Sequence, residues 1–246
     1  MATFFTDNIS SSKITITGED VLHIKKVLRH KDGDVLKICD GRGTFYSAKI
    51  LDIAECEISC EIIDTKKADT EPELEVTLYQ GLPKASKMDY IIQKTTELGI
   101  LNIVPVALSR CVVKLEGKKA EEKKCERWQK ISSEAAKQCG RGVIPKVFLP
   151  MTLDEVIEDM KKCDLSFALY EAEEERNLKK ILTTTPNVKK LSFLVGPEGG
   201  LADEEVEKLK KAGIASVGLG KRILRTETAG EAALSMIMYE LGDINK

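Results

Sequence analysis

Two glycine turns near the carboxyl end of the chain carry the residues best suited to bind a ligand. The apolar residues 191–195 run into the turn GPEGG at 196–200, and residues 215–220 run into KRILRTET at 221–228. Glycine tolerates backbone angles and close approaches that other residues resist, so such turns present bare N–H and C=O groups to a small molecule. Open α/β sheets bind ligands where neighbouring parallel strands end, and we therefore predict one pocket between these turns.

The spacing of the glycines argues against the common phosphate-binding motifs. Gly218 and Gly220 could begin a dinucleotide fingerprint, but Ile223 occupies the position of its third glycine. Gly213 and Gly218 have the separation of a phosphate loop, yet Leu219 stands where its lysine must be. The chain has two histidines and neither Gly-x-Ser-x-Gly nor His-Glu-x-x-His, which argues against a Ser-His-Asp hydrolase or a zinc protease.

A ligand that has no phosphate and needs backbone hydrogen bonds plus an apolar slot fits what remains. S-adenosylmethionine is such a ligand, because its adenine can pair with the amides and carbonyls of the 218–224 loop and stack against Leu219, Ile223 and Leu224. Its cationic sulfonium tolerates carbonyl oxygens but not a close lysine. Ordinary strand-to-helix turns rich in glycine would show the same pattern, so both interpretations stay open at this point.

Composition is typical of a globular chain with reduced cysteines. The chain has 246 residues, which is long enough for two domains, and its hydrophobic content of 42% is enough to bury a core. No apolar run approaches 18 residues and the start lacks a signal core, so we expect a cytoplasmic protein without a membrane span. The seven cysteines form no Cys-x-x-Cys, and we expect no metal site.

The net charge of −2 hides an uneven distribution. Residues 84–146 contain 14 Lys and Arg against 7 Asp and Glu, whereas residues 147–180 contain 5 against 9. A surface divided in this way can present a positive patch to nucleic acid. The solvated face of a polar helix over 117–139, which interleaves both signs, would also account for much of the excess.

Alternation of apolar and polar residues predicts a small β-rich domain at the start of the chain. A helix over 19–30 would bury apolar residues 21, 24, 27 and 28, and the polar segment 66–72 ends in proline as a linker does. The expected strands are 13–17, 34–40, 44–53 and 56–63.

The remainder alternates strands and helices, which predicts an α/β fold with a mainly parallel sheet. Thr152 and Glu155 form a capping box for one helix, Asp203 caps another, and Thr228 with Glu231 starts the last. The expected inner face of that last helix is Ala229, Ala232, Ala233, Met236 and Ile237. The expected strands are 74–82, 102–108, 165–170, 191–195 and 215–220, with further helices at 87–99 and 117–139.

These motifs resemble the RsmE family of methyltransferases, which belongs to the SPOUT class and methylates N3 of a uridine in 16S ribosomal RNA. The resemblance covers the chain and rests on 196–201 with Glu204 or Glu205, 219–229, 97–99, 134–141 with Pro145, 27–29 and 33–34. One departure is visible: the family often has a histidine pair before Val-Leu-Arg, and here His23 is followed by Ile24.

The resemblance implies an amino-terminal PUA-like barrel for RNA over 1–70 and a SPOUT domain over 74–246 whose chain passes through a deep trefoil knot. It also implies a homodimer with the last helix near the interface. The implied cofactor is S-adenosylmethionine, and the implied partner is 16S rRNA or the small ribosomal subunit.

By resemblance the cofactor sits among three loops. Leu169 and Tyr170 could equally be core residues at a strand end. The expected cofactor-binding residues are Leu169, Tyr170, Glu171, Gly196, Pro197, Glu198, Gly199, Gly200, Leu201, Leu219, Gly220, Ile223, Leu224, Arg225, Thr226 and Thr228.

Chemistry at uracil N3 requires loss of a weakly acidic proton and stabilisation of the resulting anion. Arg225 is expected to contact the base or its phosphate because its planar guanidinium suits a planar anion, and an ion pair with Glu227 is the equal alternative. Glu198 and Glu227 are both candidates for the base or for cofactor contacts, and Glu227 could instead serve the helix dipole.

RNA contacts are expected from basic residues in two places. Lys25, Lys26 and Arg29 lie on the amino-terminal helix, and Lys84, Lys87, Arg110 and Arg141 lie near the catalytic face. Two other functions remain open: a SPOUT methyltransferase that acts elsewhere on RNA, for example at a ribose, and a non-catalytic RNA-binding ribosome-assembly factor.

Overall fold

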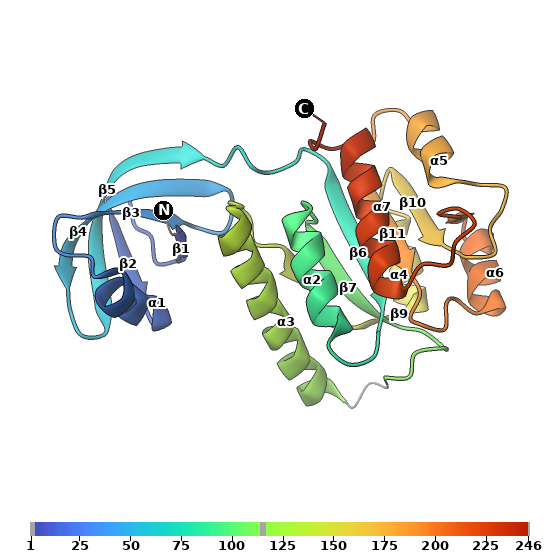
Figure 1. Ribbon diagram of the computed structural model, residues 1–246, viewed down its shortest axis with the longest axis horizontal. Coiled ribbons are helices and arrows are strands. Elements are labelled where there is room, and N and C mark those ends of the chain that lie inside the picture. Colours follow the sequence, from blue (N-terminus) through green and yellow to red (C-terminus); the bar gives the residue numbers. More distant parts are fainter. Residues whose placement is uncertain (1–2, 114–116, 246) are drawn as a thin grey trace. The chain divides into compact units, whose positions relative to one another are not determined.

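The computed structural model describes residues 3–113 and 117–245. These fall into two compact units (Figure 1). Unit 1 comprises the chain up to residue 71 together with 136–144, and unit 2 comprises 72–135 and the chain from 145 onwards.

Unit 1 is built on a five-stranded sheet with the order β1-β3-β4-β5-β2. Strands β1 and β3 pair in parallel, and the other neighbouring strands pair antiparallel. The register between the two longest strands shifts twice, which bends them. All four predicted strands are confirmed and β1 was not predicted. The strands are β1 (Thr3–Phe5), β2 (Lys13–Thr17), β3 (Val35–Cys39), β4 (Thr44–Ile53) and β5 (Glu57–Lys67).

The helix predicted over 19–30 is wrong in its second half. Helix α1 (Glu19–Leu22) continues as a π-helical turn, η1 (His23–Leu28), and Arg29 ends it in the left-handed region with φ of 58°. Each residue of a π-helix turns through a smaller angle than in an α-helix, so the apolar spacing no longer lies on one face. Ile24 is buried as expected, whereas Val27 is 68% exposed.

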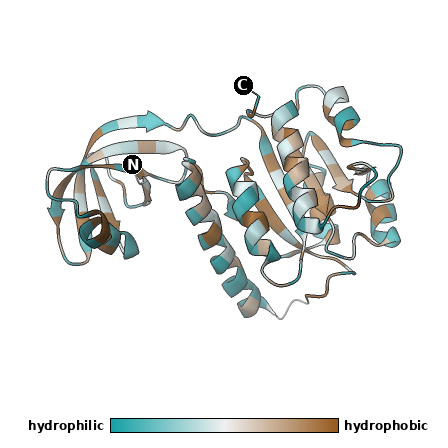
Figure 2. Ribbon diagram, viewed as in Figure 1, coloured by the Kyte–Doolittle hydropathy of each residue, from teal (hydrophilic) through white to brown (hydrophobic). Residues whose placement is uncertain are grey.

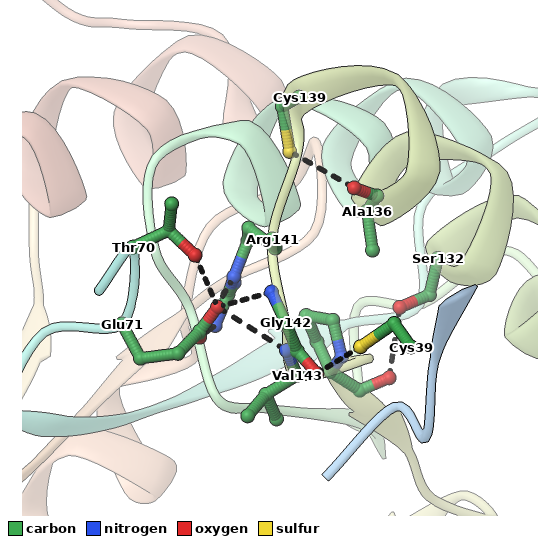
Figure 3. A network of polar contacts seen from close by, with 10 residues as sticks. Cys39, Thr70, Glu71, Ser132, Ala136, Cys139, Arg141, Gly142 and Val143 are labelled. Atoms are coloured by element: carbon green, nitrogen blue, oxygen red, sulfur yellow. Dashed lines mark hydrogen bonds and ion pairs between the residues drawn. The ribbon is translucent and has the colours of Figure 1, made fainter. Parts of the chain in front are cut away.

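Residues 140–144 complete unit 1 although they follow a helix of unit 2. Gly43 donates its amide hydrogen to the carbonyl of Gly142 at 3.0 Å. The Glu71 carboxylate accepts hydrogen bonds from the amides of Gly142 and Val143 at 2.8 and 3.2 Å, and from the Arg141 guanidinium at 2.7 Å (Figure 3). An ion pair with the buried Arg141 therefore fastens this segment to Glu71, which follows β5 in the chain.

Unit 2 contains a seven-stranded sheet in which every pairing is parallel. Its order is β12-β10-β11-β6-β7-β8, with β9 beside β7. Figure 2 shows the central strands mainly in the brown of hydrophobic residues, as expected for strands buried on both faces. The strands are β6 (Glu75–Gly81), β7 (Asn102–Ala107), β8 (Lys146–Val147), β9 (Met151–Thr152), β10 (Leu165–Leu169), β11 (Lys190–Val195) and β12 (Ala215–Val217).

Helices cover both faces of this sheet and make two apolar cores. One core packs α2, α3, α5 and α7 against the strands, and the other packs α4 and α6 against the opposite face (Figure 1). The helices are α2 (Lys87–Glu97), α3 (Lys118–Cys139), α4 (Leu153–Met160), α5 (Leu178–Thr184), α6 (Asp203–Lys211) and α7 (Thr226–Glu240). The mainly parallel α/β fold is thus confirmed.

Two predicted helix starts are wrong. Ala202, not Asp203, is the N-cap of α6, and its amide donates to the Glu205 carboxylate at 2.9 Å. Helix α7 begins at Thr226 instead of Thr228, because Arg225 is its N-cap and accepts a hydrogen bond from the amide of Ala229.

The predicted inner face of α7 is right only in part. Ala233 and Ile237 are buried, but Met236 is 48% exposed. The buried face is shifted toward Gly230 and Leu234, because α7 packs against α2 and α5 as well as against β11. A helix with several neighbours buries a wider arc than one apolar stripe predicts.

Candidate functional site

A cavity of about 430 Å³ opens where β10, β11 and β12 end. Its size falls in the range of small-molecule sites. Every wall comes from unit 2. The lining residues are Lys87, Leu169, Tyr170, Glu171, Val195, Gly196, Pro197, Glu198, Gly199, Gly200, Val217, Leu219, Gly220, Arg222, Ile223, Leu224, Arg225, Thr226 and Ala229.

The structure brings nearly all predicted cofactor residues together around this cavity. Leu201 and Thr228 do not line it, because Leu201 is buried in the core beneath and Thr228 is exposed on the first turn of α7. Leu169 both lines the cavity and packs in the core, so the two interpretations of that strand end are compatible. Sequence reasoning missed the lining residues Lys87, Val195, Val217, Arg222 and Ala229.

Some of the missed lining residues could have been predicted from their places at strand ends, but Lys87 could not. Val195 and Val217 are the last residues of β11 and β12, at the strand ends that face the predicted pocket. Lys87 begins α2, more than one hundred residues earlier in the chain, and nothing local to its sequence indicates that it reaches this cavity.

Two glycines of the 196–200 turn are required by close packing. A Cβ at Gly200 would collide with the carboxylate of Glu171, and the residue has φ of 68°. A Cβ at Gly196 would lie 2.8 Å from the carbonyl carbon of Gly200. The turn therefore closes on itself, and its backbone forms the cavity wall without intervening side chains.

A buried hydrogen-bond relay fixes the start of the same turn. The Thr226 hydroxyl donates to the carbonyl of Gly196 at 2.6 Å and accepts from the Gln80 amide at 2.9 Å. Both side chains are buried. A Cβ at Gly81 would lie 2.7 Å from the ring of Pro197, so the end of β6 also packs directly on the turn. The relay joins β6, β11 and α7 beside the cavity.

Three charged side chains meet beside the cavity, and two of them, Lys87 and Glu198, line it. The Lys87 ammonium lies 3.1 Å from a carboxylate oxygen of Glu198 and 3.1 Å from one of Glu227. The interactions with these carboxylates, Glu198 first and then Glu227, raise the pKa of Lys87 above its usual range. Burial alone would raise the pKa of Glu198, but the amide of Lys84 at 3.0 Å and the Lys87 ammonium lower it overall. Glu198 is therefore ionised at neutral pH.

The predicted catalytic residues separate in this arrangement. Arg225 and Glu198 line the cavity, whereas Glu227 does not. Glu227 pairs with Lys87, so the structure forms this ion pair in place of the one considered between Arg225 and Glu227. Arg225 is an exposed residue of the cavity lining.

The basic residues expected to contact RNA occupy different environments. Lys25, Lys26 and Arg29 are exposed on and after η1 in unit 1. In unit 2, Lys84 is exposed, and the exposed Arg110 donates to the carbonyl of Gly199 at 2.9 Å.

Two of the residues expected to contact RNA form ion pairs within the chain. Arg141 is only 4% exposed and its guanidinium is engaged with Glu71, so its role is in the packing of unit 1. Lys87 lines the cavity and forms ion pairs with two carboxylates there, and its predicted contact with RNA stays a prediction.

Within 3–113 and 117–245, no group of three His, Cys, Asp or Glu side chains is arranged to hold a metal ion. Among the helices that the structure describes, none is long and apolar enough to cross a membrane.

Comparisons with known proteins agree on one family. The profile of the RNA methyltransferase domain matches residues 70–238, and that of the RNA methyltransferase PUA domain matches residues 16–63. The Ribosomal RNA small subunit methyltransferase E of Bacillus subtilis (strain 168) is 37% identical over 230 residues, covering 92% of this chain and 90% of that protein.

Solved structures show the same likeness over whole chains. A Ribosomal RNA small subunit methyltransferase E from Neisseria gonorrhoeae, bound to S-adenosyl methionine, has a TM-score of 0.87 and 30% identity, with 99% of both chains covered. A methyltransferase from Legionella pneumophila, in complex with bound cofactor SAM, has a TM-score of 0.87 and 28% identity over 99% of both chains.

Proposed function

The chain belongs to the RNA methyltransferase family whose members are named ribosomal RNA small subunit methyltransferase E, and from this membership we propose that it methylates N3 of a uridine in 16S rRNA. It is an S-adenosylmethionine-dependent methyltransferase of small-subunit ribosomal RNA. The observation that carries the proposal is the cavity of three loops at the carboxyl ends of β10, β11 and β12.

The cavity suits the proposed cofactor in shape and chemistry. Glycines of the 196–200 turn and Gly220 expose backbone groups for the adenine and the methionine part, and Leu219, Ile223 and Leu224 supply an apolar slot for the purine. When bound, the cofactor supplies an electrophilic methyl group on a cationic sulfur. The chain's own residues hold it in place and keep the 196–200 turn in one conformation.

The proposed reaction exchanges one proton for one methyl group at N3. The N3–H bond breaks and the proton passes to the Glu198 carboxylate, which lines the cavity in its ionised form. The bond between the methyl carbon and sulfur then breaks as the N3–C bond forms, leaving S-adenosylhomocysteine and 3-methyluridine. Glu198 returns its proton to water. Arg225 at the exposed side of the cavity contacts the base or its phosphate.

RNA binding is assigned to unit 1 and to the rim of the cavity. Residues 1–70 form the proposed PUA-like RNA-binding domain and residues 74–246 the proposed SPOUT domain with its trefoil knot. Lys25, Lys26 and Arg29 supply phosphate contacts. A homodimer through α7 is proposed because Met236 and Tyr239 are 48% and 60% exposed on that helix.

Methyl transfer from labelled S-adenosylmethionine tests this function. The substrates are small ribosomal subunits that lack their native modification, with naked 16S rRNA beside them, and mass spectrometry identifies the product nucleoside. We expect 3-methyluridine. A different methylated nucleoside would move the target to another position, and cofactor binding without transfer to either substrate would point to another RNA. Absence of cofactor binding would favour an RNA-binding assembly factor.

A further inference from the structure

Lys87 is the only lining residue of the cavity whose ammonium is held by two carboxylates, among the residues that the structure describes. An ammonium has three N–H donors. Its nitrogen forms two ion pairs, 3.1 Å from a carboxylate oxygen of Glu198 and 3.1 Å from one of Glu227. These two oxygens can engage no more than two of the three donors, so at least one remains for an oxygen that enters the cavity.

The position of this donor is fixed from several sides. Glu198 comes from the 196–200 turn and also accepts the amide hydrogen of Lys84 at 3.0 Å. Glu227 comes from the first turn of α7. A lysine side chain is flexible by itself, but two anchors on different elements restrict this one to the cavity wall. The donor is therefore in place before any acceptor binds.

The charge of the cluster decides which oxygen suits it. One ammonium and two carboxylates sum to a net charge of −1. A carboxylate or phosphate would meet repulsion from Glu198 and Glu227. A carbonyl oxygen is neutral when it binds and gains negative charge only during the reaction, so it can accept a hydrogen bond from Lys87 without that penalty.

We propose that Lys87 donates a hydrogen bond from its remaining N–H to a carbonyl oxygen of the acceptor base and stabilises the charge that the oxygen gains when N3 loses its proton. This inference rests on the proposed function. As the N3 proton moves to Glu198, the cluster changes from −1 to neutral while the base changes from neutral to −1. The ammonium is then opposed by one carboxylate, and its charge is directed at the base.

Other titratable groups near the cluster are identified by their contacts. Tyr90 of α2 donates to Glu231 of α7 at 3.0 Å, and that hydroxyl lies near Glu227. Cys111 lies near Glu198, and Arg225 shares the cavity wall. These groups are kept unchanged in every variant below.

The test replaces Lys87 by Met and measures binding separately from turnover. In Lys87→Met we expect the Kd of S-adenosylmethionine, measured by calorimetry, to stay within about 3-fold of wild type. We expect kcat on unmodified small subunits to fall by about 10²–10³-fold, the usual effect of losing one donor to a developing oxyanion. The rate of the variant should rise more steeply with pH than that of wild type, because the uracil must then lose its N3 proton without an ammonium to stabilise the anion.

Matched variants keep the test decisive. Lys94→Met removes an ammonium from the same helix, where it pairs with Glu97 at 2.9 Å outside the cavity, and should retain wild-type kcat. Lys87→Arg should recover part of kcat because it restores the charge. Lys87→Met alone leaves two carboxylates without a cation. Adding Glu227→Gln returns the cluster to its wild-type charge of −1, and kcat should stay low in this double variant.

Three results would overturn the inference. A Kd for S-adenosylmethionine weakened by about 10-fold or more in Lys87→Met would assign the donor to the cofactor. An unchanged kcat with a raised KM for subunits and a lower salt slope would make Lys87 a phosphate contact. Full recovery of kcat in the double variant would show that only charge balance matters. Wild-type activity on the same subunits separates these results from a failure of the proposed function.

Discussion

Gly220 and Gly213 form a natural pair for separating backbone strain from loss of ligand contact. Both have positive φ, of 103° and 85°, and in both a Cβ would meet nothing within 4 Å. Only Gly220 lines the cavity. A side chain at either position therefore strains the backbone to a similar degree, at a cost of about 1–3 kcal/mol.

Gly220→Val should weaken S-adenosylmethionine by about 10-fold or more, which corresponds to about 1.4 kcal/mol of binding free energy. Gly213→Val should lose similar stability and bind the cofactor as wild type does. Calorimetric titration and thermal unfolding of both variants provide the measurement. Equal affinities in the two variants would mean that the 219–228 loop does not hold the cofactor.

The predictable part of the site is the part that is local in sequence. Gly196 and Gly200 signal a tight turn by their type alone, and the structure shows the close contacts that require them. Lys87 carries no such signal, because its position depends on how β6 and α2 lie beside β11. The helix start predicted at Thr228 is wrong for a different reason. The sequence contains a capping-box pattern there, but α7 already starts at Thr226.

At the scale of elements, η1 offers a compact basic surface on unit 1. Lys25 and Lys26 are exposed there. Reversing both charges with Lys25→Glu and Lys26→Glu should weaken binding of 16S rRNA and lower the slope of log K against log salt by about 1 for each lost contact. Reversal of Lys49 and Lys67, which are exposed elsewhere in unit 1, is the control. Equal effects of the two double variants would remove η1 from the RNA surface.

Arg141 belongs to the same scale because it fastens a segment. Replacing it by Met leaves the Glu71 carboxylate without its buried cation, and we expect a loss of about 2–3 kcal/mol in the free energy of unfolding. Arg42→Met changes an exposed arginine on the neighbouring turn and should alter stability by less than about 0.5 kcal/mol. Urea denaturation measures both, and equal stabilities would contradict the assigned role.

Elements were predictable where apolar spacing was regular and tertiary contacts agreed with it. Strand β2 alternates buried and exposed residues as its sequence indicates. The π-helical turn was not predictable, since residues 21, 24, 27 and 28 fit an α-helix equally well in sequence. The attachment of 140–144 to unit 1 was also beyond reach, because it depends on hydrogen bonds to residues about one hundred positions earlier.

For the whole molecule, ionised carboxylates predict acid sensitivity. Two amides lower the pKa of Asp164, and the Thr152 amide and hydroxyl lower that of Glu155. A carboxyl group with a lower pKa in the folded state stabilises the fold above its unfolded pKa and loses that contribution as pH falls. The groups with lowered pKa are Asp34, Asp69, Glu155, Asp159, Asp164, Glu173 and Glu198.

The free energy of unfolding should therefore change little above about pH 5 and decrease as pH falls below about 4.5, through the ordinary range of these groups. Urea titrations at fixed ionic strength between pH 7 and pH 3 measure it. A stability that stays constant or rises on acidification would contradict the assigned carboxylate contacts.

The attachment of residues 136–144 to unit 1 has a consequence for synthesis of the chain. The polypeptide passes from unit 1 to unit 2 after residue 71, returns at 136 and leaves again after 144. The Glu71 carboxylate thus emerges from the ribosome long before Arg141. At 5–20 residues per second, translation of residues 72–144 takes about 4–15 s. During that interval unit 1 lacks its last segment, and its completion waits for more than half of the protein to be made.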